Sequence, residues 1–173
     1  MSSSPTDPLK SLTSQHGQTL DELSRSQPLL VVCLRHGGCA FCREALSDVS
    51  QNRAAIEQVG TSIALVHMMS DAVAAKLFEK YDLDNLPRVS DPERQLYRAF
   101  RFKRGSIWAV MGPRVWWSGF RTTLLGGHVP GKPVGDVMQL PGALLLVDGE
   151  VRRSFHAETS ADKPDYVQLS QHS

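Results

Sequence analysis

The chain has 173 residues, 41% of them hydrophobic and 21% charged, which is enough to bury the core of a single domain. Its 19 basic and 18 acidic residues leave a formal net charge of +1, so no overall field attracts nucleic acid or an anionic membrane. The longest apolar stretch, residues 107–120, is interrupted by glycine, proline and arginine, which excludes it as a membrane span.

The start of the chain and its cysteines predict a cytoplasmic location. Residues 1–15 begin with a polar stretch rich in serine and proline, which predicts a disordered tail and not an export signal. The chain has three cysteines, too few for the disulfide framework of a small secreted protein. We therefore expect one domain over residues 16–173, with neither a membrane nor a nucleic acid as partner.

The first predicted elements are a helix, a strand and a second helix. Residues 19–26 favour a short helix, and the continuous apolar run Leu29–Leu34 is typical of a strand buried on both faces. Such a strand is usually central and parallel, with helices above and below it. Apolar residues then recur at helical spacing over residues 42–59, and Gly60 ends that helix.

The next elements continue the alternation of strand and helix. Ser62–Met68 is a strand candidate, and Asp71–Tyr81 is a short amphipathic helix. A third helix is predicted from about Pro92 to Phe100, with Ser90 or Asp91 as its N-cap and Pro92 in its first position.

The last third of the chain predicts an insertion and a hairpin. Residues 101–140 are rich in glycine and tryptophan and form an expected insertion, with a helix around 115–125. Residues 143–147 and 151–156 flank an Asp-Gly turn and predict an antiparallel hairpin. A closing helix lies within 164–172, with Asp162 near its start. The predicted fold is an α/β three-layer sandwich with a mixed central sheet, a C-terminal hairpin and helices on both faces.

The junction between the buried strand and its helix contains Cys39 and Cys42. The amide end of a helix favours a thiolate, so we expect a lowered pKa for Cys39, with Arg35 and His36 adding positive charge. Cys42 lies one helical turn later, within bridging reach of Cys39. The pattern predicts that Cys39 attacks a substrate and Cys42 resolves the product. His36 is either a hydrogen-bond donor or general acid at the site, or a loop residue that caps the turn.

The cysteines and His36 allow two other interpretations, a zinc site and inert core thiols. His36, Cys39 and Cys42 resemble zinc ligands, but a structural zinc site needs four ligands and no histidine elsewhere shows paired spacing, so no metal is expected. Two inert core thiols are a second alternative. Cys33, inside the apolar strand, is expected to be a buried small hydrophobe.

Two further patterns carry less weight. Residues 126–132 fit part of a phosphate loop, but Pro133 replaces the required serine or threonine, and no nucleotide or other cofactor is expected. Trp108, Trp116 and Trp117 are expected to pack in the core of the insertion; the alternative is an exposed aromatic surface for a partner or for a homodimer.

Five segments together resemble the peroxiredoxin-like branch of the AhpC/TSA group, in the thioredoxin-like superfamily. They are Leu34–Glu44, Ser90–Phe100, Gly126–Pro133, Pro141-Gly142 and Asp162–Tyr166. The resemblance implies a thioredoxin-like fold and a redox-active thiol, with Cys39 as the peroxidatic cysteine and Cys42 as its resolving partner. It also implies a peroxide or disulfide substrate, which Gly38 and Pro141 would border, and an external dithiol reductant such as a thioredoxin or glutathione system.

The chain departs from ordinary peroxiredoxins at three positions. They have a proline seven residues and a threonine or serine three residues before the attacking cysteine, where this chain has Val32 and His36. Their active-site arginine in the late strand would fall near Pro141, and Arg35 is the candidate to replace it. Three functions therefore stay open: a peroxidase, a thioredoxin-like protein disulfide reductase, and a non-enzymatic redox sensor or binding module.

Overall fold

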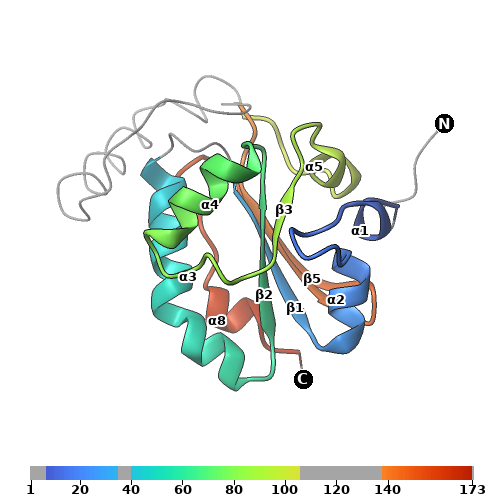
Figure 1. The fold of residues 1–173 in the computed structure, drawn as a ribbon. Coiled ribbons are helices and arrows are strands. Elements are labelled where there is room, and N and C mark those ends of the chain that lie inside the picture. Colours follow the sequence, from blue (N-terminus) through green and yellow to red (C-terminus); the bar gives the residue numbers. More distant parts are fainter. Residues whose placement is uncertain (1–6, 35–39, 106–137, 173) are drawn as a thin grey trace.

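The computed structural model describes residues 7–34, 40–105 and 138–172. The helices and strands along these segments are shown in Figure 1. In chain order they are α1 (Asp7–Ser11), α2 (Leu20–Ser26), β1 (Leu29–Cys33), α3 (Ala40–Gln58), β2 (Ser62–His67), α4 (Asp71–Glu79), β3 (Arg88–Ser90), α5 (Gln95–Ala99), β4 (Gly142–Val147), β5 (Glu150–His156) and α8 (Tyr166–Leu169).

The five strands form one mixed sheet in the order β3-β2-β1-β4-β5. β1 lies parallel to β2 and antiparallel to β4, while β5 pairs with β4 as the C-terminal hairpin. All five residues of β1 are buried, because the strand has a neighbour on each side and helices on each face. The predicted mixed sheet with a terminal hairpin is thereby confirmed.

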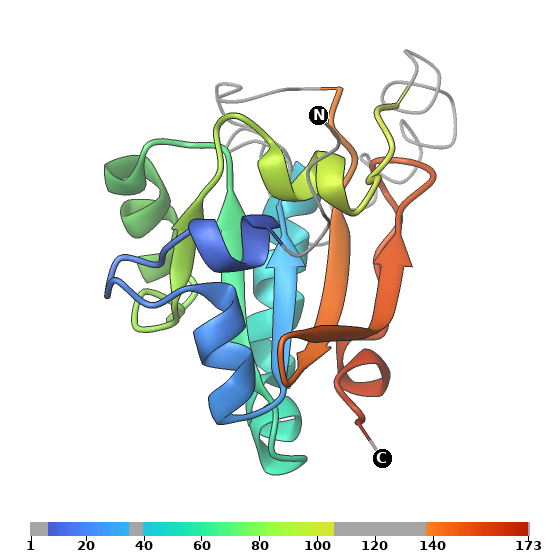
Figure 2. The same ribbon diagram turned by 90° about the vertical axis from the view of Figure 1, so that its right-hand side faces the viewer.

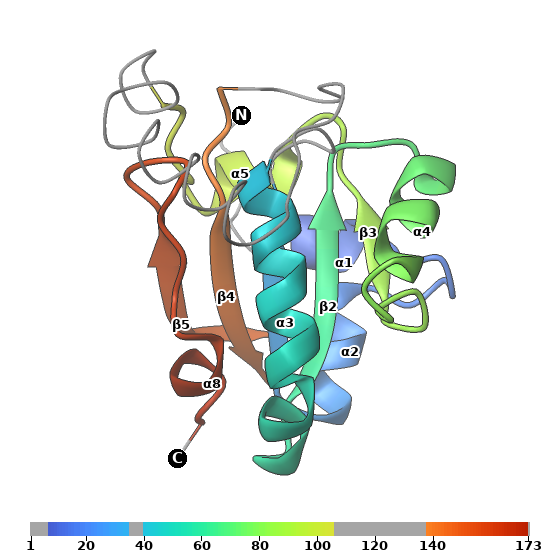
Figure 3. The ribbon, with the colours of Figure 1, turned by 90° about the vertical axis from the view of Figure 1, so that its left-hand side faces the viewer.

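Helices cover both faces of the sheet and make two hydrophobic cores. The alternation of β1 places Leu30 and Val32 in the core on one face of the sheet. Figure 3 shows α3, α4 and α8 covering this face. Val31 and Cys33 belong to the opposite core. Figure 2 shows α1, α2 and α5 covering that face of the sheet. This arrangement confirms the predicted three-layer sandwich, and the burial of Cys33 agrees with its assignment as a core residue.

The prediction of a disordered tail over residues 1–15 is wrong from residue 7 onward. Residues 7–11 form α1, and Leu9 is only 1% exposed because it packs in the core beneath α2 and α5. Ser14 then forms a β-bridge with Val89, and the side chain of Gln15 accepts a hydrogen bond from the backbone of Arg88 at 2.7 Å. The segment is ordered because it supplies partners to the edge strand β3.

The region after β2 differs from its prediction in two ways. β3 was not predicted, because three residues are too few to show an alternating pattern. α5 begins at Gln95 and not at Pro92, since residues 92–94 form a turn in which Arg94 has a left-handed φ of 58°. Asp91 still caps the helix, because its carboxylate accepts hydrogen bonds from the backbone amides of Gln95 and Leu96 at 2.8 and 2.9 Å.

The base of the predicted insertion lies within the described residues, and its remainder does not. Arg104 forms a β-bridge with Gln139, and the amide of Gly105 donates to the carbonyl of Met138 at 2.7 Å. These contacts bring the two ends of the insertion together. The tryptophans and the expected helix around 115–125 lie outside the described residues. In the part that is described, no helix has the length and apolar character needed to cross a membrane.

The last residue of β2, His67, is a fully buried titratable group. Its ring packs edge to face against Phe78 of α4, with centroids 5.7 Å apart, and neither ring nitrogen has a hydrogen-bond partner at good distance and angle among the described residues. Burial lowers the pKa of His67 from 6.5 to about 4, against a smaller opposing effect of the Asp71 carboxylate. The folded protein therefore holds this imidazole neutral at pH 7.

This burial makes the free energy of unfolding depend on pH. The pKa of His67 is lower in the folded protein than in the unfolded chain. As the pH falls below 6.5, the unfolded chain therefore binds a proton on His67 while the folded protein does not, and the free energy of unfolding decreases until about pH 4. Between pH 7 and pH 5 we expect a loss of about 2 kcal/mol, measured by urea unfolding. His67→Leu should remove that part of the pH dependence, whereas the exposed control His16→Gln should keep it. Equal slopes for wild type and His67→Leu would contradict the assignment.

Candidate active site

The site predicted from the sequence lies where β1 ends and α3 begins. The amide of Leu34 donates to the carbonyl of Val66 at 2.9 Å, which extends the pairing of β1 with β2 by one residue. α3 then starts at Ala40 and continues for 19 residues. Four of the predicted site residues, Arg35, His36, Gly38 and Cys39, lie outside the described residues. The structure therefore places Cys42 and Pro141, the other two.

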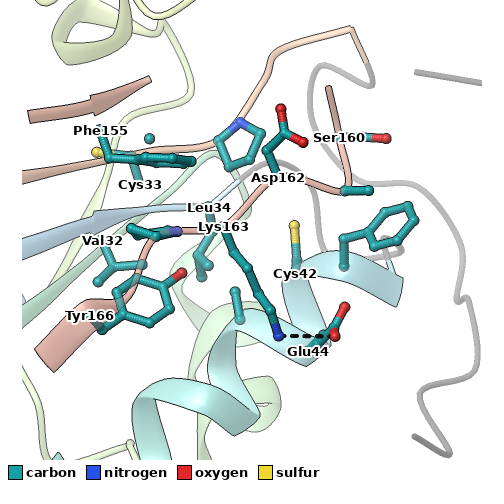
Figure 4. A pocket seen from close by; sticks show the side chains of 16 residues that line it. Val32, Cys33, Leu34, Cys42, Glu44, Phe155, Ser160, Asp162, Lys163 and Tyr166 are labelled. Atoms are coloured by element: carbon teal, nitrogen blue, oxygen red, sulfur yellow. Dashed lines mark hydrogen bonds and ion pairs between the residues drawn. The ribbon is translucent and has the colours of Figure 1, made fainter. Parts of the chain in front are cut away.

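Cys42 occupies the first turn of α3 and is 4% exposed. Its sulfur points from the helix into a pocket at the carboxyl end of β1, whereas the sulfur of Cys33 lies on the far side of that strand (Figure 4). Burial, followed by the charge of Asp91, raises the pKa of the Cys33 thiol well above its usual range. Both residues border this pocket, but of the two only Cys42 belongs to the core beneath α3, and Cys33 belongs to the core on the other face of the sheet.

The pocket around Cys42 is small and mostly apolar. Phe41, Pro141, Phe155 and Tyr166 are among the side chains that line it. Its free space of about 20 Å³ has room for about one water molecule. The pocket thus brings Cys42 of α3 next to Pro141, from the residues that lead into β4.

Pro141 stands directly before β4. Its carbonyl accepts a hydrogen bond from the amide of Ala157 at 3.3 Å, which ties the start of β4 to the residue that follows β5. No peptide bond in the described residues is cis, so the Leu140–Pro141 bond is trans. The structure shows Pro141 beside Cys42, and its role toward a substrate stays a prediction.

The outer wall of the pocket is the loop of residues 157–165, which connects β5 to α8. Asp162 shapes this loop: its carboxylate accepts hydrogen bonds from the amides of Glu158 and Thr159 at 2.9 and 2.8 Å, and from the Thr159 hydroxyl. Asp162 was expected near the start of the closing helix. The cap of α8 is instead Asp165, which accepts from the amide of Gln168 at 2.9 Å.

Lys163 fastens this loop to α3. Its ammonium group lies 3.0 Å from the carboxylate of Glu44 and 2.5 Å from that of Asp48, as the dashed line to Glu44 in Figure 4 indicates. Partial burial lowers the pKa of Lys163, but the hydrogen bonds to Asp48 and Glu44 outweigh that effect and raise it overall. Lys163 therefore stays charged and holds the loop over Cys42.

Tyr166 closes the inner side of the pocket. Its side chain is 6% exposed, and burial raises the pKa of the phenol well above its usual range. No role for Tyr166, Lys163 or Phe155 is predicted from the sequence. The only signal for the first two was their place in or beside the segment Asp162–Tyr166, which carries part of the family resemblance.

The described residues hold no group of three or more histidine, cysteine or acidic side chains arranged to bind a metal ion. Two members of the zinc set weighed from the sequence, His36 and Cys39, are outside these residues. The chemistry that the described part supports is that of a thiol in an apolar environment at the amide end of a long helix.

Comparison with known proteins agrees with this geometry. No protein-family model matches the chain. Curated relatives include the prostamide/prostaglandin F synthase of Salmo salar, 27% identical over 169 residues, which is 95% of this chain and 81% of that protein. The prostamide/prostaglandin F synthase of Danio rerio is 26% identical over 168 residues, which is 94% of this chain and 82% of that protein.

Similar solved structures are peroxiredoxins. Peroxiredoxin Q of Xanthomonas campestris has a TM-score of 0.61 at 18% identity, covering 88% of this chain and 84% of its own. Peroxidoxin BcpB of Mycobacterium tuberculosis has a TM-score of 0.62 at 16% identity, and the match covers 92% of this chain and 87% of that protein. The resemblance found in the sequence is therefore confirmed in the fold, and this chain has the peroxiredoxin-like form of the thioredoxin-like fold.

Proposed function

We propose that this protein is a thiol-dependent oxidoreductase in which Cys39 attacks a peroxide and Cys42 resolves the product as an intramolecular disulfide. The position of Cys42 carries the proposal: its sulfur sits in the first turn of α3, in an apolar pocket at the end of the central strand. Cys39 precedes it by three residues in the sequence, directly before the first residue of α3. The peroxiredoxin-like fold supports this assignment.

The reaction has two steps before the enzyme is reset. The Cys39 thiolate attacks one peroxide oxygen, so that an S–O bond forms, the O–O bond breaks, and the other oxygen leaves with a proton as an alcohol or water. Cys39 is then a sulfenic acid. The Cys42 thiol attacks its sulfur, and the departing hydroxide takes the thiol proton to form water. An external dithiol, of the thioredoxin or glutathione type, returns two electrons and two protons to the disulfide.

The residues around the pair have distinct proposed roles. The positive end of the α3 dipole favours the thiolate of Cys39, with added positive charge from Arg35. His36 donates a hydrogen bond or a proton to the leaving oxygen. Gly38 and Pro141 border the substrate, and Pro141 does so from the wall of the Cys42 pocket.

Two kinds of oxidant are candidates, hydrogen peroxide and organic peroxides, and the observations favour an organic peroxide. The walls of the pocket are mostly aromatic and apolar side chains, which would contact a carbon skeleton once the loop of residues 157–165 opens. The curated relatives are named as synthases of prostaglandin F or a prostamide, which are organic products. Both points support a small organic substrate.

Cysteine variants test the proposal. With hydrogen peroxide or cumene hydroperoxide and a dithiol donor, we expect Cys39→Ser to lower the turnover rate by at least about a hundredfold, since the nucleophile is lost. Cys42→Ser should allow one oxidation of Cys39 and then stop turnover. The control Cys33→Ala should keep turnover, because Cys33 points into the other core.

Three results would overturn it. They are peroxide consumption by wild type no faster than without protein, undiminished turnover by Cys39→Ser, and failure of mass spectrometry to find a link between Cys39 and Cys42 after one equivalent of peroxide. Insulin reduction without peroxide consumption would identify the protein as a disulfide reductase. Stoichiometric oxidation without turnover would identify a redox sensor.

Resolution also requires that Cys42 become accessible, and the loop of residues 157–165 controls this. Cys42 is 4% exposed beneath the loop, and free space in the pocket is limited to about one water. The Lys163 ammonium and its two carboxylate partners are each between 24% and 41% exposed, so their attraction is screened by solvent and salt. We infer that this ion pair is a weak closure that opens transiently.

Lys163→Ala tests this closure in a Cys39→Ser background. We expect the rate of Cys42 alkylation by iodoacetamide to rise roughly two- to fivefold, the effect of losing an ion pair of up to about 1 kcal/mol. Lys103→Ala is the matched control, since the ion pair of Lys103 at 3.3 Å is with Glu158 of the same loop and not with a carboxylate of α3. If both variants change the rate equally, or neither does, the closure is not made by Lys163.

A further inference from the structure

A tyrosine from the opposite helical layer holds the end of β1. Tyr97 belongs to α5 and is fully buried. Its hydroxyl donates a hydrogen bond to the carbonyl of Leu34 at 2.5 Å and lies 3.4 Å from the carbonyl of Val66. The hydroxyl therefore joins the ends of β1 and β2 from the side of the sheet that faces away from α3.

The Leu34 carbonyl needs this donor. Leu34 is 3% exposed, and the pairing of β1 with β2 ends with the bond from its amide to Val66. Among the described residues, Tyr97 is the donor that reaches its carbonyl. Because a buried carbonyl without a donor is costly, the hydroxyl of Tyr97 determines how the peptide at Leu34 is oriented.

The tyrosine is itself held in place. Its ring packs edge to face against Phe102, with centroids 5.9 Å apart. The start of its helix is fixed by the Asp91 carboxylate, and the amide of Asp91 donates to the carbonyl of His67 at 2.7 Å. Burial raises the pKa of the phenol well above its usual range, so the hydroxyl keeps its proton and remains a donor. The group is thus preorganised by contacts outside the active site.

We propose that Tyr97 is a positioning residue, which fixes the carbonyl of Leu34 and thereby the direction in which the chain enters the segment carrying Cys39. Leu34 is followed directly by residues 35–39 and then by α3. A small displacement of a reacting group can lower a rate strongly, so a rigid start for this segment matters to the chemistry. The inference deepens the proposed function, on which it rests for the role of Cys39.

The test is the pH profile of Cys39 alkylation in Tyr97→Phe, resolved by mass spectrometry of the reduced protein. This substitution removes the hydroxyl and keeps the ring. We expect the midpoint of the profile to rise by about half to one pH unit relative to wild type, and the alkylation rate at pH 7 to fall about three- to tenfold. The physical reason is that the peptide at Leu34, five residues before Cys39 in the sequence, loses the donor that orients it.

Leu96→Ala is the matched control. Leu96 is the preceding residue of α5, is fully buried, and its truncation is at least as destabilising as the loss of one hydrogen bond. A shift with Tyr97→Phe but not with Leu96→Ala supports the proposal; an unchanged profile, or equal shifts, overturns it. Measuring both in trimethylamine N-oxide keeps a destabilised variant folded. The alkylation needs no peroxide, so absence of turnover in wild type would reject the proposed function while leaving this result readable.

Discussion

Burial of β1 on both faces is the constraint from which the rest of the structure follows. Its five residues have no solvent-facing side, so the sheet needs a helical layer above and another below. The same burial places the carboxyl end of the strand beneath the first turn of α3, where Cys42 lies. Side chains from both helical layers can therefore reach a site at this junction, although the sheet separates the two layers elsewhere.

The sequence predicts the fold well where its pattern is strong. The continuous apolar run of β1, the helical spacing of α3 and the Asp-Gly hairpin each specify an element through residues close in the chain. It fails at α1, β3 and the start of α5. These depend on distant partners: α1 buries Leu9 in a core built by other elements, and the three residues of β3 are a strand only because β2 lies beside them.

The candidate site also has some features that the sequence predicts and others that depend on residues distant in the chain. The position of Cys42 on a helix after the buried strand follows from local pattern, and its proximity to Pro141 follows from the resemblance to thioredoxin-like proteins. The role of Lys163 could not be predicted from local sequence pattern. Lys163 pairs with Glu44 and Asp48, which are 119 and 115 residues away in the chain, and charged residues of these types are common on any protein surface. The bond from Tyr97 to Leu34 spans 63 residues and depends equally on the folded sheet.

The two layers act on the site with different strengths. From the α5 side, a fully buried hydroxyl holds a backbone carbonyl, and removing such a donor leaves a desolvated group without compensation. From the α3 side, a partly exposed ion pair holds the loop over Cys42, and water and salt can replace it at little cost. The end of the strand is thus rigid, while the loop over Cys42 is weakly held. A dithiol cycle needs both properties, because attack requires a fixed nucleophile, and resolution followed by reduction requires a second sulfur that can be exposed.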